Sequence, residues 1–255
     1  MRITFIGSGN VATHMAAALK NAGHSILQVY SPNMHNAAML AYHVGAEAIS
    51  DMKDMNAEAD LYIVSVKDDA IETVVQHLSA FNKLIVHTSG ATSLNTLSVH
   101  TQNAGVFYPL QTFSKQKKVS FWSVPLCIEG ASEEITQQLF ELAHTISNNV
   151  YRVSSDQRKI LHLAAVFACN FPNYLYHVSQ QLLAQHQLDF DLLKPLINET
   201  ADKIQSALPV DVQTGPAIRN DEQTMQAHIN LLDNNPFLQN LYLLMSEGIM
   251  KMEKN

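Results

Sequence analysis

The first residues of the chain place a glycine-rich turn between a strand and a helix. Residues 2–6 are a short run of β-branched and aromatic side chains, which predicts a β-strand, and residues 13–20 are good helix formers. The turn has the spacing Gly-x-Gly-x-x-Ala and consists of Gly7, Ser8, Gly9, Asn10, Val11 and Ala12. A strand, this turn and a helix in that order form the dinucleotide-binding arrangement. The N-terminus therefore predicts a nucleotide cofactor site.

The small residues of this turn have separate roles in such a site. Gly7 permits the tight turn, Gly9 lets a pyrophosphate approach the backbone, and Ala12 lets the helix lie close to the strand. The helix N-terminus adds free N–H groups and the positive end of its dipole. We expect cofactor contacts along Gly7, Ser8, Gly9, Asn10 and Val11. The alternative is a structural glycine turn that binds no ligand.

The end of the second predicted strand bears on the choice between NAD and NADP. NAD sites usually place Asp or Glu here to bind the ribose hydroxyls, but the first acid after this strand is Glu47. Ser31 followed by Pro32 is typical of an N-cap and the first residue of a helix, predicted over 32–43. That helix start, the Ser31 hydroxyl and the Asn33 amide favour an additional phosphate. The cofactor prediction is therefore NADP (NADPH), although the stretch lacks the Arg that commonly binds a 2′-phosphate.

Alternation of strands and helices continues through the first half of the chain. Apolar runs predict further strands near 61–66, 84–88, 105–108, 124–128 and 149–153, with helical segments between several of them. This alternation is typical of an α/β fold with a doubly wound parallel sheet. Ligands bind such sheets at the carboxyl ends of the strands. We therefore expect further cofactor contacts from Ser65, Val66, Lys67 and Ser89.

Beyond residue 153 the pattern becomes helical. Helices are predicted over 156–185, 189–207, 220–232 and 236–251, with a kink at Pro172. The predicted domains are therefore a cofactor-binding domain, residues 1–153, and an all-helical domain, residues 154–255, for substrate binding or dimerisation.

The helix over 156–185 carries a polar stripe on an otherwise largely apolar segment. At about 100° per residue, the side chains of the stripe fall within one narrow arc; they are Lys159, His162, Asn170, Asn173 and His177. Such a stripe either lines a cleft or forms an exposed or hydrogen-bonded face. In the first case His162, Asn170 and Lys159 are candidate catalytic residues, and the kink at Pro172 makes the last two positions weaker candidates.

Composition excludes several classes of partner. The chain has 255 residues, 47% hydrophobic residues and a formal net charge of -7. This charge argues against nucleic acid, because binding to phosphates requires clustered Lys and Arg. No apolar run reaches the length of a membrane span, and a strand that starts at Arg2 leaves no room for a signal peptide. We expect a small-molecule substrate and neither a nucleic-acid nor a membrane partner.

Cysteine and histidine usage bears on location and metals. Cys127 and Cys169 form no Cys-x-x-Cys pair, so the simplest expectation is a reduced, cytoplasmic protein. The 12 histidines form no His-Glu-x-x-His motif and no cluster with cysteine, so no metal site is expected.

Several segments resemble known reductases. The first half resembles the Rossmann-fold superfamily of pyrroline-5-carboxylate reductase and the deazaflavin-dependent NADP oxidoreductases, on residues 7–12, 64–71 and 87–90. The whole chain resembles a narrower bacterial family that joins such a domain to a helical domain of unknown function, on residues 108–113, 162–170 and 215–221. The resemblance implies an NADP-dependent oxidoreductase that forms a homodimer through the helical domain.

One departure from related enzymes directs the choice of mechanism. The β-hydroxyacid dehydrogenases carry a catalytic Lys four residues before an Asn, whereas here Val166 precedes Asn170. We therefore assign proton transfer to His162, because the unperturbed imidazole side chain of a histidine titrates near neutrality. The leading hypothesis is hydride transfer between nicotinamide and a small carbonyl or imine compound. The alternatives are a non-catalytic NADP-binding or redox-sensing module and, less favoured, a reductase of a deazaflavin.

Overall fold

The computed structural model describes residues 1–252, which divide into two compact units, residues 1–173 and 174–252. The first unit contains the sheet, and each unit is described by itself. The predicted domain boundary after residue 153 marks the change from strands to helices, whereas the compact units divide within a helix, after Asn173. No helix among the described residues has the length and apolar character that would be needed to cross a membrane.

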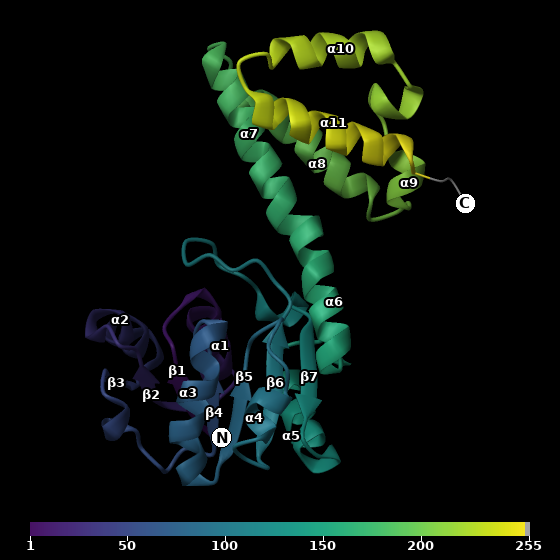
Figure 1. Cartoon of the computed structure of the whole chain (residues 1–255). Helices are drawn as coiled ribbons and strands as arrows, with labels where there is room; N and C mark the ends of the chain where they lie inside the picture. The colour runs from purple at the N-terminus through teal and green to yellow at the C-terminus, as the bar shows by residue number, and fades with distance from the viewer. Residues whose placement is uncertain (253–255) are drawn as a thin grey trace. The chain divides into compact units, whose positions relative to one another are not determined.

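Eight strands form one sheet in the first unit, in the order β3-β2-β1-β4-β5-β6-β7-β8 (Figure 1). The strands are β1 (Arg2–Ile6), β2 (Ser25–Tyr30), β3 (Glu47–Ile49), β4 (Leu61–Val64), β5 (Leu84–His87), β6 (Ala104–Pro109), β7 (Leu126–Gly130) and β8 (Val150–Arg152). Every neighbouring pair is parallel except β6 and β7, which run antiparallel. The predicted doubly wound α/β sheet is confirmed, with this one reversal.

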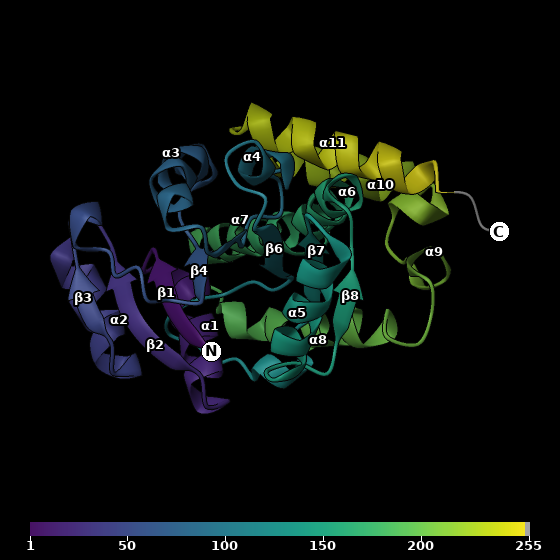
Figure 2. The ribbon, with the colours of Figure 1, turned by 90° about the horizontal axis from the view of Figure 1, so that it is seen from below.

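Helices cover both faces of the sheet. The helices of this unit are α1 (Asn10–Asn21), α2 (Met34–Val44), α3 (Asp68–Leu78), α4 (Asn95–Ser98), α5 (Glu133–His144) and α6 (Ser155–Ala165). Short 3₁₀ turns are η1 (Met52–Asp54), η2 (Ser79–Phe81) and η3 (Phe121–Ser123). Side chains of α1, α2 and α5 share one buried cluster, whereas those of α3 and α4 belong to a second cluster on the other face (Figure 2).

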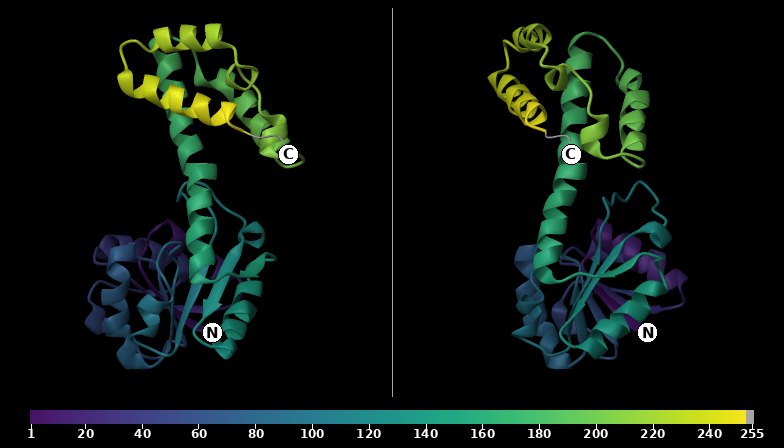
Figure 3. Two further views of the ribbon diagram at one scale, coloured as in Figure 1. Left: turned by 45° about the vertical axis from the view of Figure 1, so that its right-hand side comes forward. Right: turned by 90° about the vertical axis from the view of Figure 1, so that its right-hand side faces the viewer.

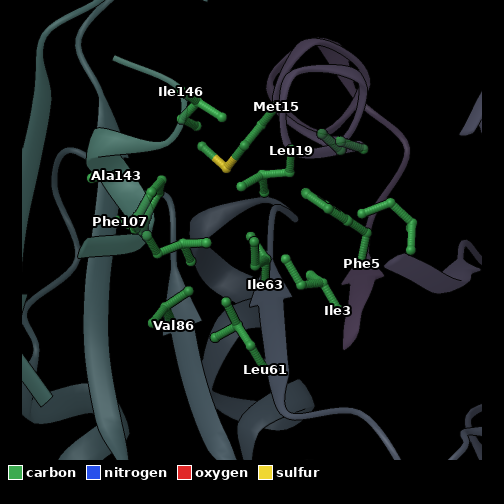
Figure 4. Close-up of a cluster of buried hydrophobic side chains, with 14 of the residues drawn as sticks. Ile3, Phe5, Met15, Leu19, Leu61, Ile63, Val86, Phe107, Ala143 and Ile146 are labelled. Atoms are coloured by element: carbon green, nitrogen blue, oxygen red, sulfur yellow. The ribbon is translucent and has the colours of Figure 1, made fainter. Parts of the chain in front are cut away.

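The two-residue period of the strands separates these clusters. Phe107 of β6 packs into the first cluster, which also contains Met15 of α1 and Ala143 of α5 (Figure 4). Its neighbours Val106 and Tyr108 point to the opposite face, where they pack against Leu161 of α6. Successive side chains of a strand point to opposite faces, so this alternation aims Tyr108 at α6.

The second unit is helical. It contains most of α7 (Phe171–Gln185), followed by η5 (Phe190–Leu193), α8 (Lys194–Lys203), α9 (Pro209–Val212), η6 (Ala217–Arg219), α10 (Glu222–Leu231) and α11 (Pro236–Met250). Within this unit α8 and α11 lie on opposite sides of α7 (Figure 3). The prediction that the C-terminal part is all helical is confirmed.

One local prediction was wrong. Helix α2 begins at Met34 with Asn33 as its N-cap, rather than Ser31, because the Asn33 side chain accepts a hydrogen bond from the Asn36 N–H. The predicted interruption of the long helix at Pro172 corresponds to a π-helical turn, η4 (Val166–Asn170), just before that residue, and the kink remains a prediction. Proline has no N–H to donate, and a π turn is one of the ways in which a helix changes its hydrogen-bonding register.

A buried ion pair attaches α6 to the sheet. Arg158 is fully buried, and its Nη1 lies 2.7 Å from Oε2 of Glu129 in β7. Its Nη2 donates to the Thr92 carbonyl oxygen at 2.5 Å. The Glu129 carboxylate also accepts hydrogen bonds from the N–H and hydroxyl of Ser155, at 2.9 and 2.7 Å. The first turn of α6 is therefore bound both to β7 and to the turn after β5.

Removal of one partner from this buried pair is expected to destabilise the fold strongly. Arg158→Ala leaves the Glu129 carboxylate without its cation, a change that typically costs about 3–5 kcal/mol of unfolding free energy. Arg152→Ala is the matched control, because its pair with Glu133 is exposed on both sides and is worth about 0–1 kcal/mol. Urea unfolding measures both variants, and equal losses would contradict a special role for Arg158.

Candidate functional site

The glycine turn joins the ends of three strands. Gly7 has a φ of +111°, and a Cβ atom there would lie 2.2 Å from the Ser65 carbonyl oxygen, so any side chain would collide with the backbone. The Gly7 N–H donates to the Tyr30 carbonyl oxygen at 2.8 Å. These contacts tie the turn after β1 to the ends of β2 and β4, as the role predicted for Gly7 requires.

The second glycine borders open space. A Cβ on Gly9 would meet no atom within 4 Å, and Gly9 is the N-cap of α1 without a side-chain capping bond. The first N–H groups of α1 are therefore free of a capping side chain beside an uncrowded backbone, which fits a pyrophosphate. Ser8 is buried here, whereas Asn10 is exposed and Val11 half-buried. The Asn10 amide donates to the Phe113 carbonyl oxygen at 2.9 Å, which links the turn to the loop after β6.

Ser31 and Asn33 follow the carboxyl end of β2, but both already have structural contacts. Ser31 is buried, and its N–H donates to the Ile49 carbonyl oxygen at 3.1 Å. The Asn33 side-chain oxygen caps α2. Asn33 is exposed, and its side-chain N–H groups remain able to donate to a ligand. Their predicted contact with a 2′-phosphate remains a prediction.

The other predicted cofactor residues lie at the ends of β4 and β5. The Ser65 hydroxyl is 3.0 Å from that of Thr88. Val66 is half-buried, and Lys67 is exposed at the N-cap of α3. The Ser89 hydroxyl accepts hydrogen bonds from the N–H groups of Ala91 and Thr92, at 3.1 and 2.9 Å. Ser89 therefore shapes the turn after β5, and its own O–H remains able to donate.

His162 lies against two residues of the sheet. Its Nδ1 is 3.1 Å from the Tyr108 hydroxyl, and the two rings meet edge to face. On the same edge, a Cβ built on Gly90 would lie 2.6 Å from Nδ1. Glycine at position 90 therefore makes the space that the imidazole occupies.

A pocket of about 380 Å³ opens beside this pair. Its lining is mostly apolar, with a few polar groups, and consists of Tyr108, Leu110, Gln111, Thr112, Leu161, His162, Ala164, Ala165, Ala168, Cys169 and Asn170. Two predicted catalytic residues, His162 and Asn170, are thus brought to one pocket. Lys159 lies outside the lining, about half exposed, with its Nζ 3.7 Å from the Asp156 carboxylate. Its catalytic role remains a prediction.

The π-helical turn changes the angular argument for the polar stripe. The arc was predicted for regular α-helical geometry, but the five residues 166–170 form the wider π turn. Asn170 ends that turn and still borders the pocket, together with Ala168 and Cys169 of the same turn. The position of Asn170 therefore depends on an irregularity that the residue period did not predict.

Arg158 and Gly90 were not among the predicted site residues, and Tyr108 was predicted only as the first residue of a substrate-side loop, residues 108–113. Arg158 precedes His162 by four residues, so both lie on one face of α6, and this spacing was the available signal. Gly90 belongs to residues 87–90, a segment that resembles the reductase superfamily. The contacts of Tyr108 and Gly90 with His162 join residues more than fifty positions apart and have no signature in the sequence.

His87, at the end of β5, is buried in neutral form. Its Nδ1 accepts a hydrogen bond from the Ser89 N–H at 3.1 Å. Burial first, and then the positive charge of Arg158, lower the pKa of His87 to about 3, against a backbone contact with Ser93 that raises it. The buried Nε2 of His87 has no hydrogen-bond partner among the residues described. Among residues 1–252 no group of three or more His, Cys, Asp or Glu side chains is arranged to hold a metal ion.

Comparison with known proteins places the chain in a family. Residues 2–89 match the coenzyme F420-dependent NADP oxidoreductases, and residues 124–249 match a domain of unknown function, DUF2520. The chain is 44% identical to BF3122 from Bacteroides fragilis, described as an NADP oxidoreductase, with a TM-score of 0.95 over 98% of each chain. The chain belongs to the BF3122 family of NADP oxidoreductases. This membership confirms the predicted oxidoreductase class and its NADP cofactor.

More distant structures share the fold of this NADP oxidoreductase family. An imine reductase from Myxococcus stipitatus in complex with NADP⁺ is 15% identical, with a TM-score of 0.67 over 98% of this chain and 92% of its own. A pyrroline-5-carboxylate reductase from Coxiella burnetii is also 15% identical, with a TM-score of 0.59 over 98% of each chain. No curated protein matches the chain. The predicted resemblance to pyrroline-5-carboxylate reductase is therefore confirmed for the fold.

The buried His87 predicts a pH dependence of stability. Its folded-state pKa of about 3 lies below the ordinary value of 6.5, so between these values the unfolded chain binds the extra proton. The contribution of His87 is therefore complete above pH 6.5 and is lost as the pH falls towards 3, by up to about 1.4 kcal/mol per pH unit. Urea unfolding at pH 6 and pH 4.5 measures this slope. His87→Asn, which keeps an acceptor for Ser89 but cannot titrate, is expected to show a shallower slope, and an equal slope would contradict the assignment.

Proposed function

We propose that this NADP oxidoreductase transfers hydride between the nicotinamide of NADP and a small carbonyl or imine compound. The observation that supports this best is the His162–Tyr108 pair at a largely apolar pocket, in the same unit as the glycine turn. A mostly apolar pocket with a few convergent polar groups is typical of a small-molecule site. The names of the imine reductase and the pyrroline-5-carboxylate reductase with this fold support a C=N or C=O substrate.

The cofactor residues are those of the glycine turn and the strand ends. Gly7, Ser8, Gly9, Asn10 and Val11 would hold the pyrophosphate, Ser31 and Asn33 the 2′-phosphate, and Ser65, Val66, Lys67 and Ser89 the nicotinamide half. Open space at Gly9 and the α1 N-terminus without a capping side chain support the first of these contacts. When bound, the reduced cofactor supplies the hydride.

The chain's own residues would manage the proton. As the substrate carbon receives a hydride, its oxygen or nitrogen gains a proton, for which His162 is the donor that borders the pocket. Asn170 would orient the substrate through its amide. Proton transfer is assigned to His162 before Lys159, because the Lys159 ammonium lies near Asp156 and outside the pocket lining.

We further propose a homodimer through the helical domain, residues 154–255. Among the described residues 174–252, Ala217 and Ser246 alone are buried. Large apolar side chains stay exposed in this unit, including Leu196, Leu208, Leu231, Phe237, Leu243 and Leu244. Exposed apolar surface on this scale marks an interaction surface. A second copy would bury it, as in obligate dimers, whose interfaces resemble a domain core cut in half.

The proposed location is the cytoplasm, with no nucleic-acid or membrane partner. Both cysteines are free thiols, Cys127 buried and Cys169 exposed. Burial raises the pKa of the Cys127 thiol to about 11, which keeps it protonated and unreactive at neutral pH. Two unpaired thiols suit a reducing compartment.

Replacement of His162 tests the catalytic assignment. In His162→Ala, turnover of a panel of small ketones and cyclic imines with NADPH is expected to fall by about 10²–10⁴-fold, since general acid–base catalysis contributes on that scale. The dissociation constant for NADPH, from nicotinamide fluorescence, is expected to stay unchanged. Lys159→Ala is the control, and the assignment is wrong if this variant loses turnover while His162→Ala keeps it.

The same fluorescence titration tests the cofactor. The wild-type protein is expected to bind NADPH more tightly than NADH. In Asn33→Ala the affinity for NADPH alone is expected to fall, so that the two dissociation constants become more similar. Tighter binding of NADH would refute the 2′-phosphate contact, and binding of neither would refute the enzyme proposal.

Light scattering tests the dimer. The expected mass in solution is twice the 28.3 kDa of one chain. Leu244→Glu, which places a charge on the exposed apolar surface, is expected to shift the mass towards one chain, whereas Gln226→Glu on an exposed polar position of α10 is not. A wild-type monomer at micromolar concentration would rule out the dimer.

A further inference from the structure

The imidazole of His162 is enclosed on one edge and free on the other. The Tyr108 hydroxyl lies 3.1 Å from Nδ1. Gly90 packs against the same edge, where a built Cβ would lie 2.6 Å from Nδ1, 2.7 Å from Cγ and 3.0 Å from the His162 Cβ. No hydrogen bond to Nε2 exists within the described part of the chain. The Nε2 edge is therefore the one that remains for a molecule in the pocket.

Two observations favour Tyr108 as the donor in its hydrogen bond with His162. Its side chain is buried, and burial, together with Cys127, raises the pKa of Tyr108 to about 12. The phenol therefore keeps its proton at neutral pH. Among the described residues, the one hydrogen-bond partner of this hydroxyl is His162 Nδ1, and a buried O–H group satisfies its donor where it can.

This direction decides the tautomer of the imidazole. In a neutral histidine one ring nitrogen carries the proton and the other accepts. If Nδ1 accepts from Tyr108, the proton resides on Nε2, on the edge that faces away from Tyr108 and Gly90. The hydrogen bond that one ring nitrogen makes thus sets the function of the other.

We propose that Tyr108 is a positioning residue that holds neutral His162 in the Nε2-protonated tautomer, so that an N–H donor faces the substrate oxygen or nitrogen. When Nε2 gives its proton to the substrate, Nδ1 takes up the Tyr108 hydroxyl proton, and solvent then returns a proton to the phenolate. Gly90 supports this arrangement by leaving room for the ring. The benefit to catalysis rests on the proposed function, but the tautomer is a property of the free protein and is measurable without a substrate.

Nitrogen NMR of protein labelled with ¹⁵N-histidine measures the tautomer directly. Spectra at pH 8 distinguish a protonated from an unprotonated ring nitrogen, and comparison with His162→Gln identifies the His162 signals. In the wild type, Nε2 is expected to be protonated and Nδ1 unprotonated. In Tyr108→Phe, which removes the hydroxyl and keeps the ring, both signals are expected to move towards the averaged values of the exposed His43 in the same spectrum.

One control variant and one second test variant complete this experiment. Tyr151→Phe removes the hydroxyl of an exposed tyrosine and is expected to leave the His162 signals in place. Gly90→Ala is a second test in case Tyr108→Phe does not fold. It adds a Cβ that collides with the imidazole, and it is expected to shift the His162 signals as well. A wild-type signal from the Nδ1-protonated tautomer would overturn the proposal, and so would unchanged His162 signals in a folded Tyr108→Phe.

Kinetics separate this inference from the proposed function. Once a substrate is found, Tyr108→Phe is expected to lower kcat by at least about 5- to 10-fold, because it removes one buried hydrogen bond and the proton that Nδ1 takes up, with NADPH affinity unchanged. If no substrate turns over, the proposed function fails while the tautomer result stands. If turnover requires His162 but the tautomer is the opposite one, the positioning role of Tyr108 fails alone.

Discussion

The buried pair of Arg158 and Glu129 is the interaction on which the pocket depends. This pair binds the first turn of α6 to β7, and the Arg158 guanidinium also donates to the Thr92 carbonyl oxygen in the turn after β5. His162 lies one turn further along α6, and Gly90 lies in that same β5 turn. Because the fully buried Arg158 charge requires its Glu129 partner at close range, the helix and the strand ends are held in one register. The imidazole thereby meets Gly90 and Tyr108 at contact distance.

The cofactor side of the unit follows from a different constraint, the close approach of backbones. A positive φ at Gly7 and its contact with the Ser65 carbonyl leave no space for a side chain, while Gly9 borders open space at the start of α1. The loop after β6 connects the two sides of the unit. Its Phe113 carbonyl accepts the Asn10 amide, and its earlier residues, among them Leu110 and Gln111, line the pocket beside His162.

Sequence reasoning was most successful where the signal is local. The strands, the glycine turn and the helical second half follow from residue periodicity, and most of their bounds agree with the structure to within a few residues. It was least successful where a competing local interaction or a tertiary contact decides. Asn33 rather than Ser31 caps α2, a π turn precedes Pro172, and Arg158, a charged residue for which no role was predicted, is fully buried.

The sequence by itself determined the fold class, the cofactor motif and the presence of His162 and Asn170 on one helical segment, because these depend on residue spacing over a turn or two of chain. Tertiary structure alone decided which polar residues share a pocket. It separated Lys159 from His162 and brought Tyr108 and Gly90 to the imidazole. The physical reason is that strand pairing and the buried Arg158–Glu129 contact join segments far apart in the chain, and neither leaves a periodic trace in the sequence.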